Sequence, residues 1–152
     1  RGKERGIHFI AEWISDWINS RLGPLVYGLP YHHGRLEYRR MGGSVNGTVS
    51  EGDKRAMFRG WAIDLTNLSA GDERDEFLLE RYAAFNSAGG RKRFFRVWHE
   101  PWTCTPAKVD VFCDSLLRET FEWWPWVKYA AAHISEGAWN VRMGRPRRAG
   151  DD

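Results

Sequence analysis

The chain has 152 residues and a net charge of +3, enough for one domain around one hydrophobic core. Its composition, 42% hydrophobic and 28% charged, is ordinary for a globular domain. No apolar run approaches the roughly 20 residues that a membrane-spanning helix needs, so we expect no membrane span. The nine Trp are unusual, because about two are typical of a chain this long. This excess indicates a binding surface.

The first predicted element is an amphipathic helix over residues 6–22. Its apolar residues recur at three- and four-residue spacing, and Gly23 and Pro24 are expected to end it. The apolar face is unusually wide and carries two Trp, so a homodimer through this helix is one expectation. The irregular connector that follows contains the adjacent pair His32 and His33.

Strands are predicted over residues 35–41 and 55–65. Between them, Asn46-Gly47 is flanked by valines, a pattern typical of a hairpin turn. This segment could form an ordered ribbon or a flexible loop, and we expect a partly ordered loop. A helix is predicted over 71–86 because acidic residues fill its first turn. The run RKRFFRVW at 91–98 has apolar residues on both faces, which predicts a central strand.

A longer helix is predicted over residues 106–122, with Thr105 as its N-cap and Pro106 in its first turn. Pro125 breaks it, and a short helix is expected over 127–134. The run AWNVRM at 138–143 alternates between apolar and polar residues, which predicts an edge strand.

Together these elements predict an α+β fold. We expect a two-layer sandwich of a small, mainly antiparallel sheet of three to five strands with three to four helices. Residues 1–143 would form a single globular domain, and the polar, charged segment 144–152 a disordered tail.

The residues best suited to catalysis follow the predicted central strand: His99, Glu100 and Cys104. A cysteine nucleophile with a histidine base would suit acyl transfer. Cys104 matches no protease signature, so a small enzyme with its site here is an alternative rather than the main hypothesis. The loop with His32 and His33 is a second candidate site for such an enzyme.

Neither a metal nor a cofactor is predicted. A tetrahedral zinc set is conceivable from His99, Cys104, Cys113 and His133, but the spacing lacks the paired ligands of a zinc site. The glycine-containing loops do not match phosphate-binding patterns. Two cysteines do not make a disulfide framework, so we expect a reducing, intracellular compartment.

The run ETFEWWPWVKY leads to the main functional hypothesis. Trp123, Trp124 and Trp126 surround Pro125, and neighbouring residues of a helix point about 100° apart, so at least one indole should stay exposed. With Lys128 beside them, these residues predict a contact surface with a basic rim. The main hypothesis is therefore a non-enzymatic, regulatory or adaptor-like module that binds another protein.

A second alternative is single-stranded nucleic-acid (RNA) binding. The predicted central strand combines cations with aromatic rings that could stack on bases. The residues concerned are Arg91, Arg93, Phe95, Arg96 and Trp98. This alternative requires the cationic and aromatic side chains to share an exposed face.

Overall fold

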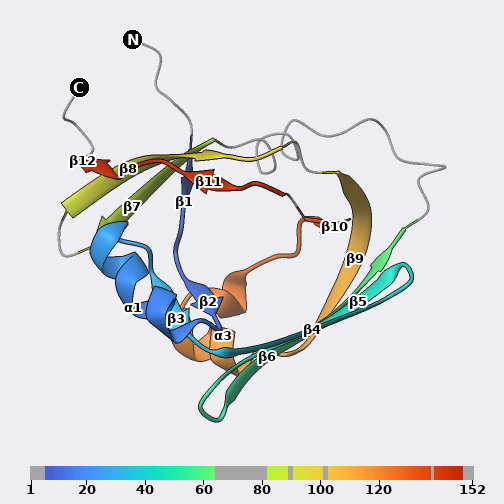
Figure 1. The fold of residues 1–152 in the computed structure, drawn as a ribbon. Helices are drawn as coiled ribbons and strands as arrows, with labels where there is room; N and C mark the ends of the chain where they lie inside the picture. The colour runs from blue at the N-terminus through green and yellow to red at the C-terminus, as the bar shows by residue number, and fades with distance from the viewer. Residues whose placement is uncertain (1–5, 64–81, 89–90, 101–102, 138, 149–152) are drawn as a thin grey trace.

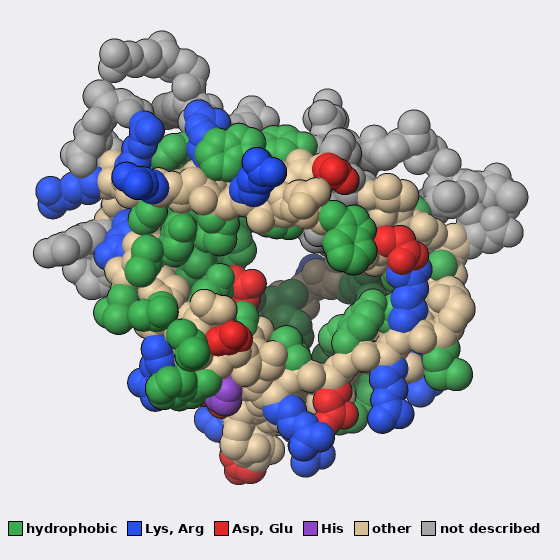
Figure 2. Space-filling view, in the orientation of Figure 1, with side chains coloured by type: hydrophobic (Ala, Val, Ile, Leu, Met, Phe, Trp, Pro, Cys, Tyr) green, Lys and Arg blue, Asp and Glu red, His purple; other side chains and the backbone are tan. Residues whose placement is uncertain are grey.

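The structure is a computed structural model that describes residues 6–63, 82–88, 91–100, 103–137 and 139–148. Within this part, strands dominate: two five-stranded sheets and one two-stranded pair are arranged in a ring (Figure 1) around a central hollow, which the space-filling view shows (Figure 2). The predicted α+β sandwich with three to four helices is therefore wrong. One of the two five-stranded sheets is antiparallel and curled, like half of a barrel.

The antiparallel sheet has the strand order β10-β9-β6-β5-β4. The strands are β4 (Arg35–Met41), β5 (Ser44–Glu51), β6 (Lys54–Ala62), β9 (Cys104–Cys113) and β10 (Ala132–Ser135). One of the two cores lies on this sheet, where Val45, Ala107 and Ile134 are buried together. The predicted strands at 35–41 and 55–65 are confirmed as β4 and, with shifted ends, β6.

The second five-stranded sheet has the order β1-β7-β8-β11, and β12 also pairs with β8. The strands are β1 (Ile7–His8), β7 (Ala83–Ala88), β8 (Arg91–Trp98), β11 (Arg142–Met143) and β12 (Arg147–Arg148). The other core, made by Leu29, Ala84 and Phe95, lies against it. The predicted strand at 91–98 is confirmed, and β12 lies within the segment expected to be a disordered tail.

A two-stranded parallel pair and a helix complete the N-terminal region. The pair is β2 (Glu12–Ile14) and β3 (Tyr31–His33), and the helix is α1 (Trp17–Val26). Asp16 caps α1, because its Oδ1 accepts a hydrogen bond from the backbone N–H of Asn19 at 2.8 Å. The predicted 6–22 helix is therefore wrong: its first half pairs as strands, and α1 continues through Pro24.

The C-terminal helices are shorter than predicted. Residues 106–113 belong to β9, and only α3 (Ser115–Thr120) is helical, followed by the 3-10 turn η2 (Trp124–Trp126). Leu116 of α3 is 1% exposed and packs the helix onto β6. The predicted helices over 106–122 and 127–134 are therefore wrong, because pairing along β6 and β9 outweighs the local helical pattern.

Two further predictions differ from the structure or fall partly outside it. Residues 83–86 of the predicted 71–86 helix belong to β7, and residues 71–81 lie outside the described residues. The predicted edge strand at 138–143 is reduced to Arg142–Met143. No helix in the described ranges is long and apolar enough to cross a membrane.

Candidate functional site

The aromatic cluster around Pro125 divides between packing and exposure. Trp124 donates a hydrogen bond from Nε1 to Asp114 Oδ2 at 2.9 Å, and Trp123 stacks on Phe121 with ring centroids 4.7 Å apart. Trp126 is 77% exposed, and Lys128 next to it is exposed too. The expectation that at least one indole stays exposed is met by Trp126 and also by Trp123, which is 47% exposed.

The proposed nucleic-acid surface does not form. Phe95 is 1% exposed and packs edge-on against Tyr27. Arg93 points the same way and donates to the backbone oxygens of α1, whereas Arg96 and Trp98 lie on the other face of β8. The predicted residues therefore do not share one exposed face: Arg93 and Phe95 lie on one side of β8, and Arg96 and Trp98 lie on the other. The side chain of Arg91 lies outside the described part.

Only two of the three residues predicted for nucleophilic catalysis line the same depression. His99 and Glu100 line an open depression of about 680 Å³ together with Arg142, and the His99 ring stacks on Tyr82 at 4.9 Å between centroids. Cys104 begins β9 and does not line this depression. Within the described residues, no group of three or more His, Cys, Asp or Glu is placed to hold a metal ion.

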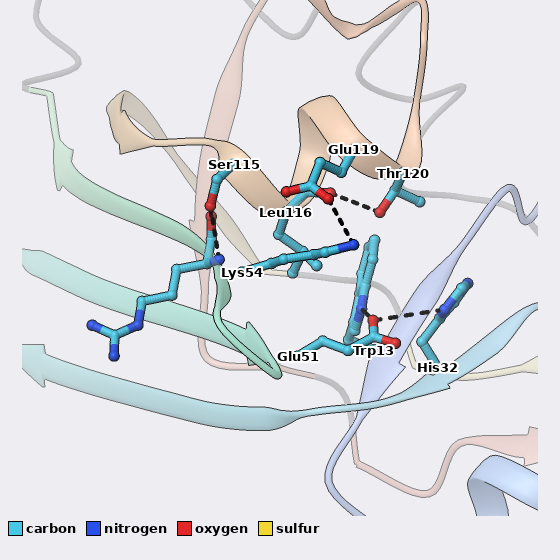
Figure 3. A network of polar contacts seen from close by, with 9 residues as sticks. Trp13, His32, Glu51, Lys54, Ser115, Leu116, Glu119 and Thr120 are labelled. Carbon is cyan, nitrogen blue, oxygen red and sulfur yellow. Dashed lines mark hydrogen bonds and ion pairs between the residues drawn. The ribbon is translucent and has the colours of Figure 1, made fainter.

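The other predicted histidine pair points to opposite sides of β3. His33 lines a groove over β4, β5 and β6. His32 stacks on Trp13 at 5.1 Å, and its Nδ1 lies 3.8 Å from Glu51 Oε2, which also accepts a hydrogen bond from Trp13 Nε1 at 2.7 Å (Figure 3). His32 therefore helps to join the β2–β3 pair to the β5–β6 hairpin.

The same region fastens α3 to the hairpin. Lys54 Nζ lies 2.7 Å from Glu119 Oε2, and the Ser115 hydroxyl accepts from the backbone N–H of Arg55 at 3.0 Å (Figure 3). The hydrogen bond to Glu119 raises the pKa of Lys54 above its usual range. This ion pair keeps Lys54 charged, so we assign the network a structural role.

An apolar cavity of about 550 Å³ adjoins the β2–β3 pair, and Trp13 lies on its lining as well as in the network with Glu51. Its walls come from α1, β2, β3 and single residues of β4 and β11. The lining residues with polar groups are Trp13, Ser15, Asp16, Asn19, Tyr27 and Tyr31. Figure 2 shows hydrophobic side chains around the central hollow, with acidic groups among them. A mostly apolar cavity with a few polar groups is the usual form of a small-molecule site.

The phenol of Tyr31 lines this cavity, and the neighbouring strand carries a carboxyl group opposite it. Glu12 and Tyr31 are register partners in the parallel β2–β3 pair. Burial raises the pKa of Glu12 above its usual range. Burial also raises the pKa of Tyr31, and the nearby Glu12 and Tyr27 add to this effect. A carboxyl group with a raised pKa beside an apolar cavity is a candidate for acid–base chemistry.

Sequence reasoning missed Glu12, Tyr27 and Tyr31. It placed Glu12 in a 6–22 helix, whereas the pairing of Glu12 with Tyr31 depends on parallel strands separated by α1. The one usable signal was Asp16, which is followed three residues later by Asn19 and caps the real start of α1.

Comparisons with known proteins identify a family and a fold. The model of the family DUF2071, described as an uncharacterized conserved protein, matches residues 1–138. The fold is similar to acetoacetate decarboxylase from Legionella pneumophila subsp. pneumophila str. Philadelphia 1, with a TM-score of 0.56 and 10% identity, and to a second acetoacetate decarboxylase structure, with a TM-score of 0.56 and 12% identity. Both likenesses cover 94% of this chain, which spans 59% and 60% of the decarboxylase chains. No curated protein matches the sequence.

These comparisons overturn the main functional hypothesis. The chain shares its fold with two decarboxylases, and this finding does not support a regulatory, protein-binding module. RNA binding is contradicted as well, in agreement with the burial of Phe95. Of the predicted functions, the small enzyme is therefore the better supported.

Proposed function

The chain belongs to the DUF2071 family, and from this premise we propose that it is an enzyme that acts on a small ketone or keto acid in the cavity beside α1. The volume of about 550 Å³ falls within the roughly 300 to 1,000 Å³ that small-molecule sites occupy. The likeness to acetoacetate decarboxylases supports an enzyme and suggests the substrate class.

The observation that carries the proposal is the position of Tyr31, which lines the apolar cavity and has Glu12 as its register partner in the neighbouring strand. A carboxylate with a raised pKa is a stronger base than an ordinary one, and its pKa lies closer to neutral pH, where general bases work best. The raised pKa of Tyr31 keeps its hydroxyl protonated, so that it can donate a hydrogen bond.

The proposed step is proton transfer next to a carbonyl group. Glu12 takes a proton from the carbon beside the carbonyl, so the C–H bond breaks and its electron pair moves into an enolate. The Tyr31 hydroxyl donates a hydrogen bond to the enolate oxygen, where the negative charge develops. Return of a proton from Glu12 to the same or another carbon completes an exchange or an isomerisation.

Decarboxylation through a reactive lysine amine is not part of this proposal. That chemistry uses a lysine made reactive by an apolar pocket or by a neighbouring cation. In the described ranges, no lysine lines the cavity, and Lys54 is held by Glu119 instead. Proton transfer by Glu12 needs no such amine.

Hydrogen exchange in D₂O tests the proposal directly. The purified protein is incubated with a panel of small ketones and keto acids, and proton NMR follows the loss of the signal next to the carbonyl. Glu12→Gln should slow exchange by about 10²- to 10⁴-fold, the usual contribution of a general base. Tyr31→Phe, which removes the donor, should slow it by a smaller factor.

Glu122→Gln is the matched control, because it makes the same charge change at an exposed position that neither lines the cavity nor pairs with Tyr31. It should exchange substrate at the wild-type rate. The proposal fails if no compound of the panel exchanges faster with the protein than without it, or if Glu12→Gln is as active as Glu122→Gln.

A further inference from the structure

A basic hollow lies at the C-terminal end of α1, outside the cavity described above. It has a volume of about 360 Å³. Its walls are Leu25 and Val26 of α1, Lys92 and Arg93 of β8, and Pro146, Arg147 and Arg148 around β12. Four of these seven residues are cationic and none is acidic. Figure 2 shows Lys and Arg side chains gathered at this side of the molecule, around β8 and β12.

The four cationic side chains differ in the contacts that they make. Arg93 is committed to the fold, because its Nη1 donates hydrogen bonds to the backbone oxygens of Leu25, at 2.8 Å, and of Val26. It neutralises the negative end of the α1 dipole. Lys92, Arg147 and Arg148 are exposed, and within the described part of the chain none of them forms an ion pair with a carboxylate.

The register of β12 brings like charges together. Arg148 lies directly opposite Arg93 in the antiparallel β8–β12 pair, and Arg147 lies opposite Phe94. Like charges directly opposite each other across a strand pair destabilise it. The short strand β12 thus places two arginines beside existing cations, at an electrostatic cost that a bound anion would remove.

We propose that this hollow binds a phosphate group. Arginine side chains present a planar set of donors that fits phosphate oxygens, and a lysine adds a further charge. The apolar wall also matters: Leu25 is 71% exposed and Val26 is 49% exposed. A phosphate group attached to an organic part satisfies the cations and covers these two side chains.

The hollow and the apolar cavity share Val26 in their linings. A phosphate group in the hollow therefore lies next to the cavity in which the proposed reaction takes place. The phosphate proposal stands on its own cations, however, and its test does not depend on exchange activity.

Isothermal titration calorimetry of the full chain with inorganic pyrophosphate, at about 50 mM salt where screening is weak, tests the binding site. We expect saturable binding to one site. Arg148→Gln and Lys92→Gln should each weaken it at least tenfold. Arg145→Gln is the matched control, because Arg145 is exposed on the same segment but does not line the hollow. It should bind like the wild type, and thermal melting should show that all variants remain folded.

A second measurement distinguishes a soluble phosphate compound from a phospholipid head group. Sedimentation with vesicles of anionic phospholipid, compared with vesicles of neutral phosphatidylcholine, reports the lipid source, and Leu25→Ser should weaken it without changing pyrophosphate binding. Binding of pyrophosphate or of anionic vesicles supports the proposal if that binding depends on Arg148 and Lys92. Absence of binding in both arms, or an equal loss in Arg145→Gln, overturns it, because the latter would show only a general charge effect.

Discussion

Gly47 of β5 lies directly opposite Phe58 of β6, and a Cβ atom on Gly47 would lie 2.2 Å from Cζ of that ring. The aromatic ring therefore covers the glycine on the face of the sheet. Phe58 also packs against the core of Val45, Ala107 and Ile134. The absence of a side chain at position 47 is thus a packing requirement of the antiparallel sheet that contains β5 and β6.

Gly47→Ala should lower the free energy of unfolding by about 1 to 3 kcal/mol, because the added methyl group forces the Phe58 ring out of its place. Urea unfolding followed by circular dichroism measures the change. Gly43→Ala is the control: its Cβ would meet only the Cβ of Ala62 at 3.7 Å, an ordinary contact. Equal losses in both variants would contradict this explanation.

The same glycine shows why a local turn signal was wrong. Asn46-Gly47 predicts a hairpin turn, yet both residues lie inside β5. The chain turns instead just before and just after this strand, at Gly42 with φ +57° and at Gly52 with φ +62°. Gly42, Gly47 and Gly52 each mark a site where the chain could have turned. The pairing of β4, β5 and β6 places the turns at Gly42 and Gly52.

The candidate site depends, even more than these turns do, on pairing between strands that are far apart in the sequence. The strand at 91–98 was predictable, because apolar residues on both faces are a local property. Glu12 and Tyr31 meet only because β2 and β3 run parallel, with α1 between them. The stripe over 109–121 fits a helix, but Ala107 fits the buried face of β9 as well. Residues nearby in the sequence do not decide between helix and strand in either of these two segments.

Leu116→Ala should destabilise the protein by about 2 to 5 kcal/mol, because Leu116 is 1% exposed and carries the packing of α3 onto β6. Leu117→Ala, at a half-buried neighbouring position of the same helix, should cost clearly less. Thermal unfolding of both variants checks the order. A larger effect at Leu117 would mean that α3 packs through its other face.

Trp126→Ala should leave the melting temperature almost unchanged, because that indole is 77% exposed. Trp124→Ala should lower it, because Trp124 is half-buried and donates to Asp114 Oδ2. This hydrogen bond and the one from Arg118 also lower the pKa of Asp114, with Arg118 the larger cause. Differential scanning fluorimetry of the two variants makes the comparison, and a reversed order would contradict the packing described for η2.

Glu12→Gln should change the pH dependence of stability in a predictable direction. Because burial raises the pKa of Glu12 in the folded protein, the folded state holds a proton that the unfolded state has already released. Between the usual glutamate value of about 4.3 and the raised folded value, wild-type stability therefore falls as the pH rises. Below this window both states are protonated, and Glu12 contributes no such loss.

Glutamine does not titrate, so Glu12→Gln should gain stability relative to the wild type as the pH rises through this window and keep the gain at pH 7. Chemical unfolding at a series of pH values between about 4 and 8 measures the difference. Glu122→Gln controls for the lost negative charge, because Glu122 is exposed. A variant more stable at pH 7 but slow in hydrogen exchange would show that the burial of Glu12 reduces stability while supporting catalysis. A variant less stable than wild type at pH 7 would mean that ionised Glu12 is stabilised by its surroundings, and the assignment of Glu12 as a desolvated base would fail.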